Sequence, residues 1–171
     1  MLDDANVLKQ RDPSGALEVA ADQWRQVKLD IQVVDKDNDN REITRVVVAG
    51  MGGSALAALL AKSWLLEKLN VTFEVVREYN LPSYVDESTL VIASSYSGNT
   101  EETLACLDQA QKQSAQIGVL AAGGKLVEKA EADNIARVVI PGGMQPRMAM
   151  LFNLRALILM LSNFGVVETS L

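Results

Sequence analysis

Short apolar runs alternate with amphipathic segments along most of the chain. The apolar runs predict strands; they cover residues 44–49, 71–76, 90–94, 116–121 and 135–140. Between and after these runs, apolar residues recur every three or four positions, as on one face of a helix. The helices predicted in this way cover residues 55–68, 101–114, 124–132 and 145–163. Most of the chain is therefore predicted to consist of strands and helices in alternation.

This alternation indicates βαβ units and hence a mostly parallel sheet. The strands are continuously apolar, which is typical of a sheet with helices on both faces, and right-handed crossovers leave few topologies. We predict an α/β fold, a doubly wound five-stranded parallel sheet of flavodoxin type with strand order 2-1-3-4-5. In such a sheet a ligand binds at the carboxyl ends of the strands near the switch point, here between the first and third strands.

The length of the chain suits a single domain covering residues 1–171. We expect an N-terminal helical segment and polar loop over residues 1–40, and the α/β core with the last helix over residues 44–167. A turn at residues 12–15 leads into the N-terminal helix. The polar run at residues 35–40 lacks the glycine and the carboxylate spacing of a calcium loop, so we interpret it as an exposed loop.

Apolar residues from Leu17 to Val34 recur at helical spacing, which predicts one N-terminal helix. The polar residues on its opposite face are Glu18, Asp22, Arg25 and Gln26. Trp24 and Trp64 fall on helical patterns and are expected to pack. Cys106 is expected to be a packed helix residue and not a nucleophile, because nothing nearby in the sequence would lower its pKa.

The last predicted helix is apolar nearly all round between residues 148 and 161. Such a helix should be buried on all sides. Two placements are open at this point. The helix is buried in the core of its own domain, or it packs against a second domain or a partner subunit, since an exposed apolar surface would drive association.

Composition narrows the possible chemistry. The net charge is −6, whereas a nucleic-acid-binding protein shows a basic stripe. No apolar run reaches the roughly 18–20 residues of a membrane span, and the first residues lack a signal-peptide core, so we expect no membrane partner and a cytoplasmic location. The single cysteine excludes an internal disulfide, and the absence of histidine excludes Ser-His and Cys-His pairs and a histidine-ligated metal. We expect no metal and no cofactor.

A glycine-rich loop, Gly-Met-Gly-Gly-Ser at residues 50–54, follows the first predicted strand. Glycines permit positive φ and close approach of a ligand, and the helix behind them offers free N–H groups and a partial positive charge. Ala55 stands where a dinucleotide-binding fingerprint needs its third glycine, and no Gly-Lys-Ser/Thr follows. An anion site and a ligand-free turn are both open.

The loop after the third predicted strand reads Ser-Tyr-Ser-Gly-Asn-Thr. Ser95, Ser97 and Thr100 place three hydroxyls at the start of a helix, and Asn99 or Thr100 is the expected cap of that helix. A cap needs one such residue, so the remaining hydroxyls predict a further role. Neutral hydroxyls and backbone N–H groups hold a phosphate dianion without any lysine, which suits an acidic chain.

These two loops resemble those of the sugar isomerase (SIS) domain family, in which the second loop grips a sugar phosphate. Further segments are similar to the bifunctional phosphoglucose/phosphomannose isomerases; they are residues 1–4, 12–15, 77–82 and 141–147. The resemblance extends from Met1 to about Val167, and the order and spacing of the segments are more specific than any one of them.

The resemblance implies that the first loop lines the sugar and the second holds the phosphate of a hexose 6-phosphate. The residues concerned are Gly52, Gly53, Ser54, Ser95, Ser97 and Thr100. It also implies that Arg147 lies over the reacting carbons and stabilises the enediolate, which a fixed guanidinium favours because negative charge develops on oxygen. Judged without the resemblance, the favoured interpretation of Arg147 is an exposed arginine in a salt bridge at a helix start, although Pro146, which sets the approach rigidly, argues against it.

An aldose–ketose isomerase also needs a base that moves a proton between C2 and C1 and an acid that opens the ring. In the family these are a glutamate and a histidine of a second SIS domain, the histidine reaching in from the partner subunit. This sequence has no histidine and stops near Glu168, where the family continues. We therefore expect a half-site that binds substrate, turns nothing over alone, and depends on a second SIS domain or a homodimer partner.

Two alternatives have other functions. A non-catalytic sugar-phosphate sensor is one, since stand-alone SIS domains occur in regulators, although no basic helix-turn-helix pattern is present here. A dinucleotide-binding module is the other, with Glu78 after the second strand as the ribose partner. Stabilisation by NADH or by glucose 6-phosphate would separate these classes.

Overall fold

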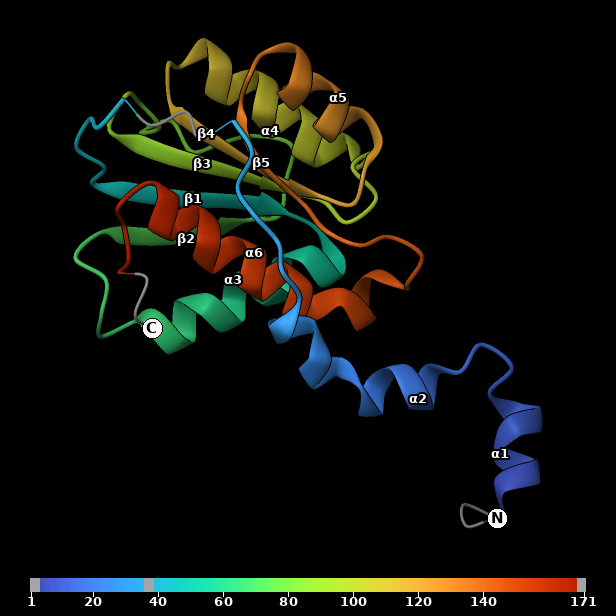
Figure 1. The fold of residues 1–171 in the computed structure, drawn as a ribbon. Helices are drawn as coiled ribbons and strands as arrows, with labels where there is room; N and C mark the ends of the chain where they lie inside the picture. Colours follow the sequence, from blue (N-terminus) through green and yellow to red (C-terminus); the bar gives the residue numbers. More distant parts are fainter. Residues whose placement is uncertain (1–3, 36–38, 169–171) are drawn as a thin grey trace.

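The computed structural model describes residues 4–35 and 39–168, and its ribbon is drawn in Figure 1. The strands are β1 (Arg45–Gly50), β2 (Thr72–Val76), β3 (Thr89–Ser94), β4 (Gln116–Ala121) and β5 (Ala136–Val139). The helices are α1 (Ala5–Arg11), α2 (Ala16–Ala21), α3 (Gly52–Leu65), α4 (Glu101–Lys112), α5 (Gly124–Ala132) and α6 (Met150–Asn163), with 3-10 helices η1 (Gln23–Lys28) and η2 (Pro146–Ala149). Every predicted strand is present.

The five strands form one parallel sheet in the order β2-β1-β3-β4-β5. This confirms the predicted topology. Helices α3 and α6 cover one face of the sheet, and α4 and α5 cover the other (Figure 1). The chain reverses its direction of winding between β1 and β3, which are neighbours. Gly50 pairs with Ser94 at the ends of these strands, so the loops that follow them leave the sheet side by side.

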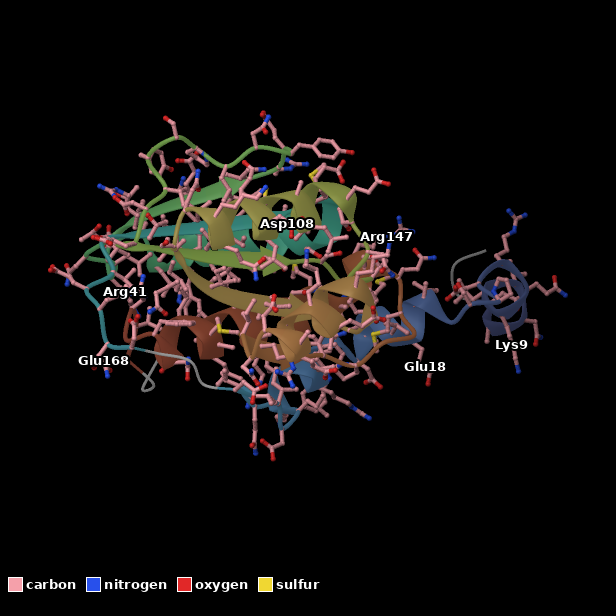
Figure 2. All side chains as sticks on the ribbon, turned by 90° about the horizontal axis from the view of Figure 1, so that it is seen from above. Lys9, Glu18, Arg41, Asp108, Arg147 and Glu168 are labelled. Atoms are coloured by element: carbon pink, nitrogen blue, oxygen red, sulfur yellow. The ribbon has the colours of Figure 1, made fainter. Side chains whose placement is uncertain are left out.

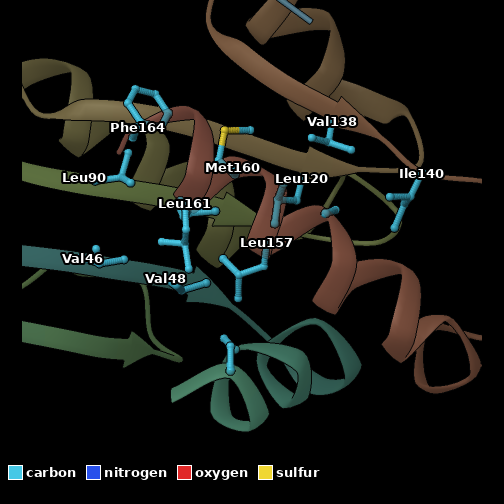
Figure 3. Packing of buried hydrophobic residues seen from close by; sticks show 14 of the residues in the cluster. Val46, Val48, Leu90, Leu120, Val138, Ile140, Leu157, Met160, Leu161 and Phe164 are labelled. Atoms are coloured by element: carbon cyan, nitrogen blue, oxygen red, sulfur yellow. The ribbon is translucent and has the colours of Figure 1, made fainter. Parts of the chain in front are cut away.

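The core is divided by the pleat of the sheet, because successive residues of a strand point to opposite faces. Val46 and Val48 pack on the α3 and α6 side, whereas Val47 packs on the α4 side. Figure 3 shows side chains of α6 lying over the strands. Met160 lies against Gly118, where an added Cβ would come within 2.8 Å of the methionine side chain. The absence of a side chain at that position lets α6 approach the sheet closely.

Helix α6 is buried within this domain along one face. The buried residues are Phe152, Asn153, Ala156, Leu157, Met160 and Leu161, and the others in the helix are half-buried. Of the two placements left open by the sequence, burial in the core of the chain's own domain therefore accounts for the buried face of α6. The helix also starts later than predicted, because residues 146–149 form the 3-10 turn η2.

The N-terminal segment differs from its prediction. The single helix expected from Leu17 to Val34 is broken into α2 and η1, and the chain is extended where Val34 forms an antiparallel bridge with Arg137. A short helix, α1, precedes them and was not predicted. Neither α1 nor α2 contains a buried residue, and both extend away from the body of the sheet (Figure 1). Within α2, only Ala16 and Val19 are half-buried, and they line a hollow shared with Met144 and Met148.

The expected packing of both tryptophans is wrong. The exposed fractions are 51% for Trp24 and 47% for Trp64. Instead of packing in a core, the rings lie under nearby ammonium groups: Lys28 Nζ is 4.7 Å from the centroid of the Trp24 ring and Lys68 Nζ is 5.9 Å from that of Trp64. Such cation–π contacts at exposed sites each contribute about 0.5–1 kcal/mol.

The polar run at residues 35–40 is exposed at both described ends, and residues 36–38 lie outside the described residues. Asp35 forms an ion pair with Arg137, and Asp39 forms one with Arg41. Within the described ranges, no helix has the length and apolar character that crossing a bilayer requires.

Candidate functional site

The first loop lies directly against the second at the carboxyl edge of the sheet. A Cβ on Gly50 would come within 2.7 Å of the carbonyl oxygen of Ser94, so only glycine fits between β1 and β3 here. Gly52 has a φ of +51° and begins α3. The free N–H groups at the start of α3 are thereby brought next to the loop that follows β3.

Ser54 connects the two loops. Its hydroxyl oxygen accepts a hydrogen bond from the backbone N–H of Tyr96 at 3.0 Å, and its exposed fraction is 4%. Ser54 therefore lies behind the surface of the loops. Gly52 is exposed and Gly53 is half-buried, so these two glycines present the accessible part of the first loop.

The three hydroxyls of the second loop converge. Ser95 Oγ is 2.7 Å from Thr100 Oγ1 and 3.5 Å from Ser97 Oγ. Ser95 is buried, whereas Ser97 is exposed. The structure thus brings the three predicted residues together, and the cluster lies at the amino end of α4.

The expected capping of α4 is not formed. Thr100 is the cap residue by position, but in the described part of the chain its hydroxyl contacts Ser95 and makes no bond to the first turn. Asn99 instead accepts the backbone N–H of Lys125 at 3.1 Å. Thr103, in the first turn, is buried, and its hydroxyl has no hydrogen-bond partner among the described residues. The Thr103 hydroxyl is too deeply buried to meet a ligand, but the backbone N–H groups of the first turn have no side-chain cap in the described part of the chain and are donors that a ligand can use.

The start of α5 supports the second loop, a contact that the sequence analysis missed. A Cβ on Gly98 would lie 1.7 Å from the carbonyl oxygen of Gly123, so the two backbones touch. Leu126 donates its backbone N–H to the carbonyl of Gly98 at 2.9 Å. The Gly-Gly pair after β4 was the available signal, because a Cβ on Gly124 would come within 2.6 Å of the carbonyl oxygen of Ser97, so this side of the contact also requires glycine.

Arg147 lies on η2, against the first loop. A Cβ on Gly53 would come within 2.8 Å of the carbonyl carbon of Pro146 and 2.9 Å of the backbone nitrogen of Arg147. Figure 2 shows Arg147 at the end of the body from which the N-terminal helices extend, far from Arg41, which precedes β1. None of the ion pairs within residues 4–35 and 39–168 involves Arg147, which is exposed. The alternative of an exposed salt bridge is therefore not supported.

Gln26 holds the segment of Arg147 from the N-terminal side. Its amide donates to the carbonyl of Met148 at 2.7 Å and accepts the N–H of Phe152 at 3.2 Å. The side chain thus fastens η2 and caps α6, which has no cap residue of its own with a side-chain bond. Gln26 was assigned to the polar face of the predicted helix, opposite the apolar stripe, but it is buried, with an exposed fraction of 4%. No local signal identifies it.

Cys106 is a packed residue, as predicted. It is fully buried, and its thiol donates to the carbonyl of Glu78 at 3.4 Å. Burial, and secondarily the charge of Glu102, raise the pKa of the thiol to about 11. A thiol with this pKa is almost entirely protonated near neutral pH and is therefore a poor nucleophile.

These features define a class of protein: an α/β domain whose glycine-rich and hydroxyl-rich loops meet at the switch point of the sheet, with one unpaired arginine beside them. Comparison with known proteins agrees with this description. Residues 41–162 match the SIS domain. The chain belongs to the SIS domain family.

The curated relatives include isomerases. A bifunctional phosphoglucose/phosphomannose isomerase of Caldicellulosiruptor bescii is 44% identical over 127 residues, which make up 74% of this chain and 38% of that protein. The chain thus spans less than half the length of this relative.

Solved structures share the fold. The C-terminal domain of glucosamine-fructose-6-phosphate aminotransferase from Francisella tularensis has a TM-score of 0.63 at 14% identity, over 89% of this chain and 49% of that one. The Vibrio vulnificus NanR protein complexed with ManNAc-6P has a TM-score of 0.60 at 17% identity, over 94% and 64%. At these identities the likeness shows the fold alone.

Proposed function

We propose that this chain is the sugar-phosphate-binding part of a glucose-6-phosphate/mannose-6-phosphate isomerase, which converts the aldose to fructose 6-phosphate through an enediol. The observation that carries the proposal is the convergence of three hydroxyls at the amino end of α4, 2.7 and 3.5 Å apart. The identity to the Caldicellulosiruptor bescii isomerase supports the choice of reaction.

In this proposal the phosphate binds at the second loop. The bond between Ser95 and Thr100 is replaced on binding, so that Ser95, Ser97 and Thr100 each donate the hydroxyl proton to a phosphate oxygen. The uncapped N–H groups of α4 complete the site. The helix N-terminus supplies a partial positive charge, so an acidic chain needs no lysine at this position. The sugar then extends over the exposed backbone of Gly52 and Gly53.

Arg147 would act on the reacting end of the sugar. A base removes the proton from C2 and returns it to C1, and negative charge develops on the enediolate oxygens in between. A guanidinium without a carboxylate partner is available to that charge, and loss of such a donor reduces turnover by about 10²–10³-fold.

The base and the ring-opening acid are assigned to a second SIS domain or to a second copy. Helix α3 offers a surface for this contact: four apolar side chains lie on its outer face with exposed fractions of 40–47%, and they are Leu56, Leu59, Leu60 and Trp64. A stripe of this kind is typical of a surface that another protein unit covers. The proposal includes neither a nucleic-acid nor a membrane partner, nor a cofactor, and it places the protein in the cytoplasm.

A second candidate is a non-catalytic sugar-phosphate sensor. The observation that favours it is the likeness in fold to NanR, whose structure holds ManNAc-6P. Such a sensor would use the same phosphate site but would gain nothing from Arg147. Its affinity for a ligand that carries the charge of the enediolate would not exceed its affinity for fructose 6-phosphate.

Calorimetric titration with fructose 6-phosphate tests the proposal, with Ser97→Ala as the site variant. Loss of one charge-assisted hydrogen bond should weaken binding about 10-fold or more. Ser83→Ala, an exposed serine outside both loops, is the matched control and should bind like the unchanged chain. Absence of binding by the folded chain would contradict the proposal, and isomerisation by the pure chain would contradict the assignment of base and acid to another unit.

A further inference from the structure

Tyr96 is part of the second loop, but its side chain reaches the segment that carries Arg147. It stands between the hydroxyl residues Ser95 and Ser97, and its exposed fraction is 7%. The phenol oxygen accepts the backbone N–H of Met144 at 3.0 Å and donates its proton to the carbonyl of Pro141 at 3.0 Å. Both hydrogen-bonding functions of the hydroxyl are therefore used on one distant segment.

The backbone of Tyr96 is equally well fixed. Its N–H donates to Ser54 Oγ at 3.0 Å, and its carbonyl accepts the N–H of Ala122 at 3.0 Å. One residue thus contacts the start of α3, the end of β4 and the segment after β5. A side chain anchored in this way cannot move without moving the second loop.

Only a short, stiff stretch separates the phenol from Arg147. Met144, which bonds the phenol, lies three residues before Arg147 in the sequence, and Pro146 restricts the backbone between these two residues. On its other side this stretch touches the backbone of Gly53. The phenol and Gly53 together define where η2 lies relative to the phosphate loop.

We propose that Tyr96 is a positioning residue, whose hydroxyl couples the phosphate loop to Arg147. A phosphate held by the hydroxyl cluster thereby brings the reacting carbons to a guanidinium at a fixed distance. The inference rests on the proposed function, because it assigns to Arg147 the charge of the enediolate. It goes further because it states that the position of Arg147 is set by the phosphate loop, through Tyr96.

Tyr96→Phe separates positioning from folding. The ring stays and fills the same space, and only the hydroxyl is lost. The experiment titrates the full chain with three probes: inorganic phosphate, fructose 6-phosphate, and a five-carbon aldonate 5-phosphate whose planar carboxylate carries the charge of the enediolate. The readout is the ratio of the affinities for the aldonate and for fructose 6-phosphate, which a merely structural change would leave unaltered.

We expect Tyr96→Phe to change phosphate affinity by less than about 2-fold, since the hydroxyl cluster is intact, and to lower the aldonate preference about 10-fold, because two hydrogen bonds that hold the Arg147 segment are lost. Arg147→Ala should abolish the preference. Adding Tyr96→Phe to Arg147→Ala should then lower it no further, since coupled residues are not additive. Tyr84→Phe, which removes a hydroxyl bonded to Glu74 elsewhere, should leave the ratio unchanged.

Each outcome separates the two ideas. If the unchanged chain prefers the aldonate and Tyr96→Phe keeps that preference, or if the two substitutions act additively, the role of Tyr96 is refuted and the proposed function stands. If the unchanged chain binds neither sugar phosphate, the proposed function fails and the inference fails with it.

Discussion

The N-terminal segment and the α/β core both show apolar residues at regular spacing, but the core buries most of them, whereas in the stripe from Leu17 to Val34 only Ile31 is buried. In the core, β1 lies between α3 and α4 on the two faces of the sheet, so Val46 and Val47 on neighbouring positions are both fully buried. In the N-terminal segment, Leu17 is 57% exposed and Val27 is 41% exposed. Periodicity therefore predicts a buried face only where another element lies opposite to it.

One polar residue of the N-terminal segment is buried, in contrast to most of the apolar residues of that segment. Most of the predicted polar face of the N-terminal segment is accessible, but Gln26 is buried and fastens both η2 and α6. The segment is thus loosely packed along most of its apolar stripe, and it is attached by the amides of Gln23 and Gln26 and by the bridge between Val34 and Arg137. This contrast indicates that its attachment to the body depends on specific hydrogen bonds more than on hydrophobic burial.

The largest loss of unfolding free energy is expected from Gly98→Ala, which tests the close packing of the loops that follow β3 and β4 in the core. The added Cβ would lie 1.7 Å from the carbonyl oxygen of Gly123 at a φ of +69°. A left-handed backbone and an overlap with a backbone atom together should cost about 3 kcal/mol of unfolding free energy or more, measured by urea unfolding.

Gly15→Ala is the matched control in the N-terminal segment. Its φ is +66°, nearly the same, but no atom of the described residues lies within 4 Å of the added Cβ. Only the backbone strain remains, so the unfolding free energy should fall by about 1 kcal/mol. Equal losses for the two variants would show that the close contact between Gly98 and Gly123 does not exist in solution.

A smaller effect is expected from Gln26→Leu, which breaks the attachment directly. The volume is largely kept, while the carbonyl of Met148 loses its stronger bond and the N–H of Phe152 loses its partner. Buried groups left unsatisfied should lower the unfolding free energy by about 2 kcal/mol. Gln32→Leu, at an exposed position, should change it by less than about 0.5 kcal/mol; a similar loss there would contradict the anchoring role.

The sequence alone predicts the sheet, but it does not predict the long-range hydrogen bonds that attach the N-terminal segment. Continuous apolar runs between turn signals identify buried parallel strands, because few other structures require them, and the topology follows from crossover rules. The hydroxyl cluster was also found, since its three residues lie within one loop. Gln26 and Met148 are 122 positions apart, and no local pattern shows that an amide at one position bonds a carbonyl at the other.

The predictions of the α4 cap and of tryptophan packing failed for a related reason. Thr100 has the residue type of a cap, but its hydroxyl is taken by Ser95. Trp64 has helical spacing, but it lies on the outer face of α3. In both cases the sequence offers the group, and the surrounding three-dimensional contacts decide how it is used. We expect the same to hold for Arg147, whose availability depends on its having no ion pair with a carboxylate of the described residues.

The smallest effect is expected in the N-terminal segment on acidification. Asp12 accepts the backbone N–H of Leu17 at 2.8 Å and of Ala16 at 2.9 Å, and these bonds hold the pKa of its carboxyl below the usual value. Because the folded pKa is depressed, the stabilisation is present above the ordinary pKa of about 4 and is lost as the pH falls through the lowered value. The first turn of α2 should therefore loosen at acid pH while the sheet remains intact.

Amide hydrogen exchange followed by NMR can resolve this local change. Exchange at Ala16 and Leu17, corrected for the intrinsic pH dependence, should accelerate below about pH 4, whereas exchange at Val47 in β1 should not. Asp12→Asn has no carboxylate to protonate, so its exchange at the same amides should show no such step. A step of equal size in the variant would show that another acidic group controls the turn. The pH dependence that distinguishes the N-terminal segment from the core would then have a cause other than the ionisation of Asp12.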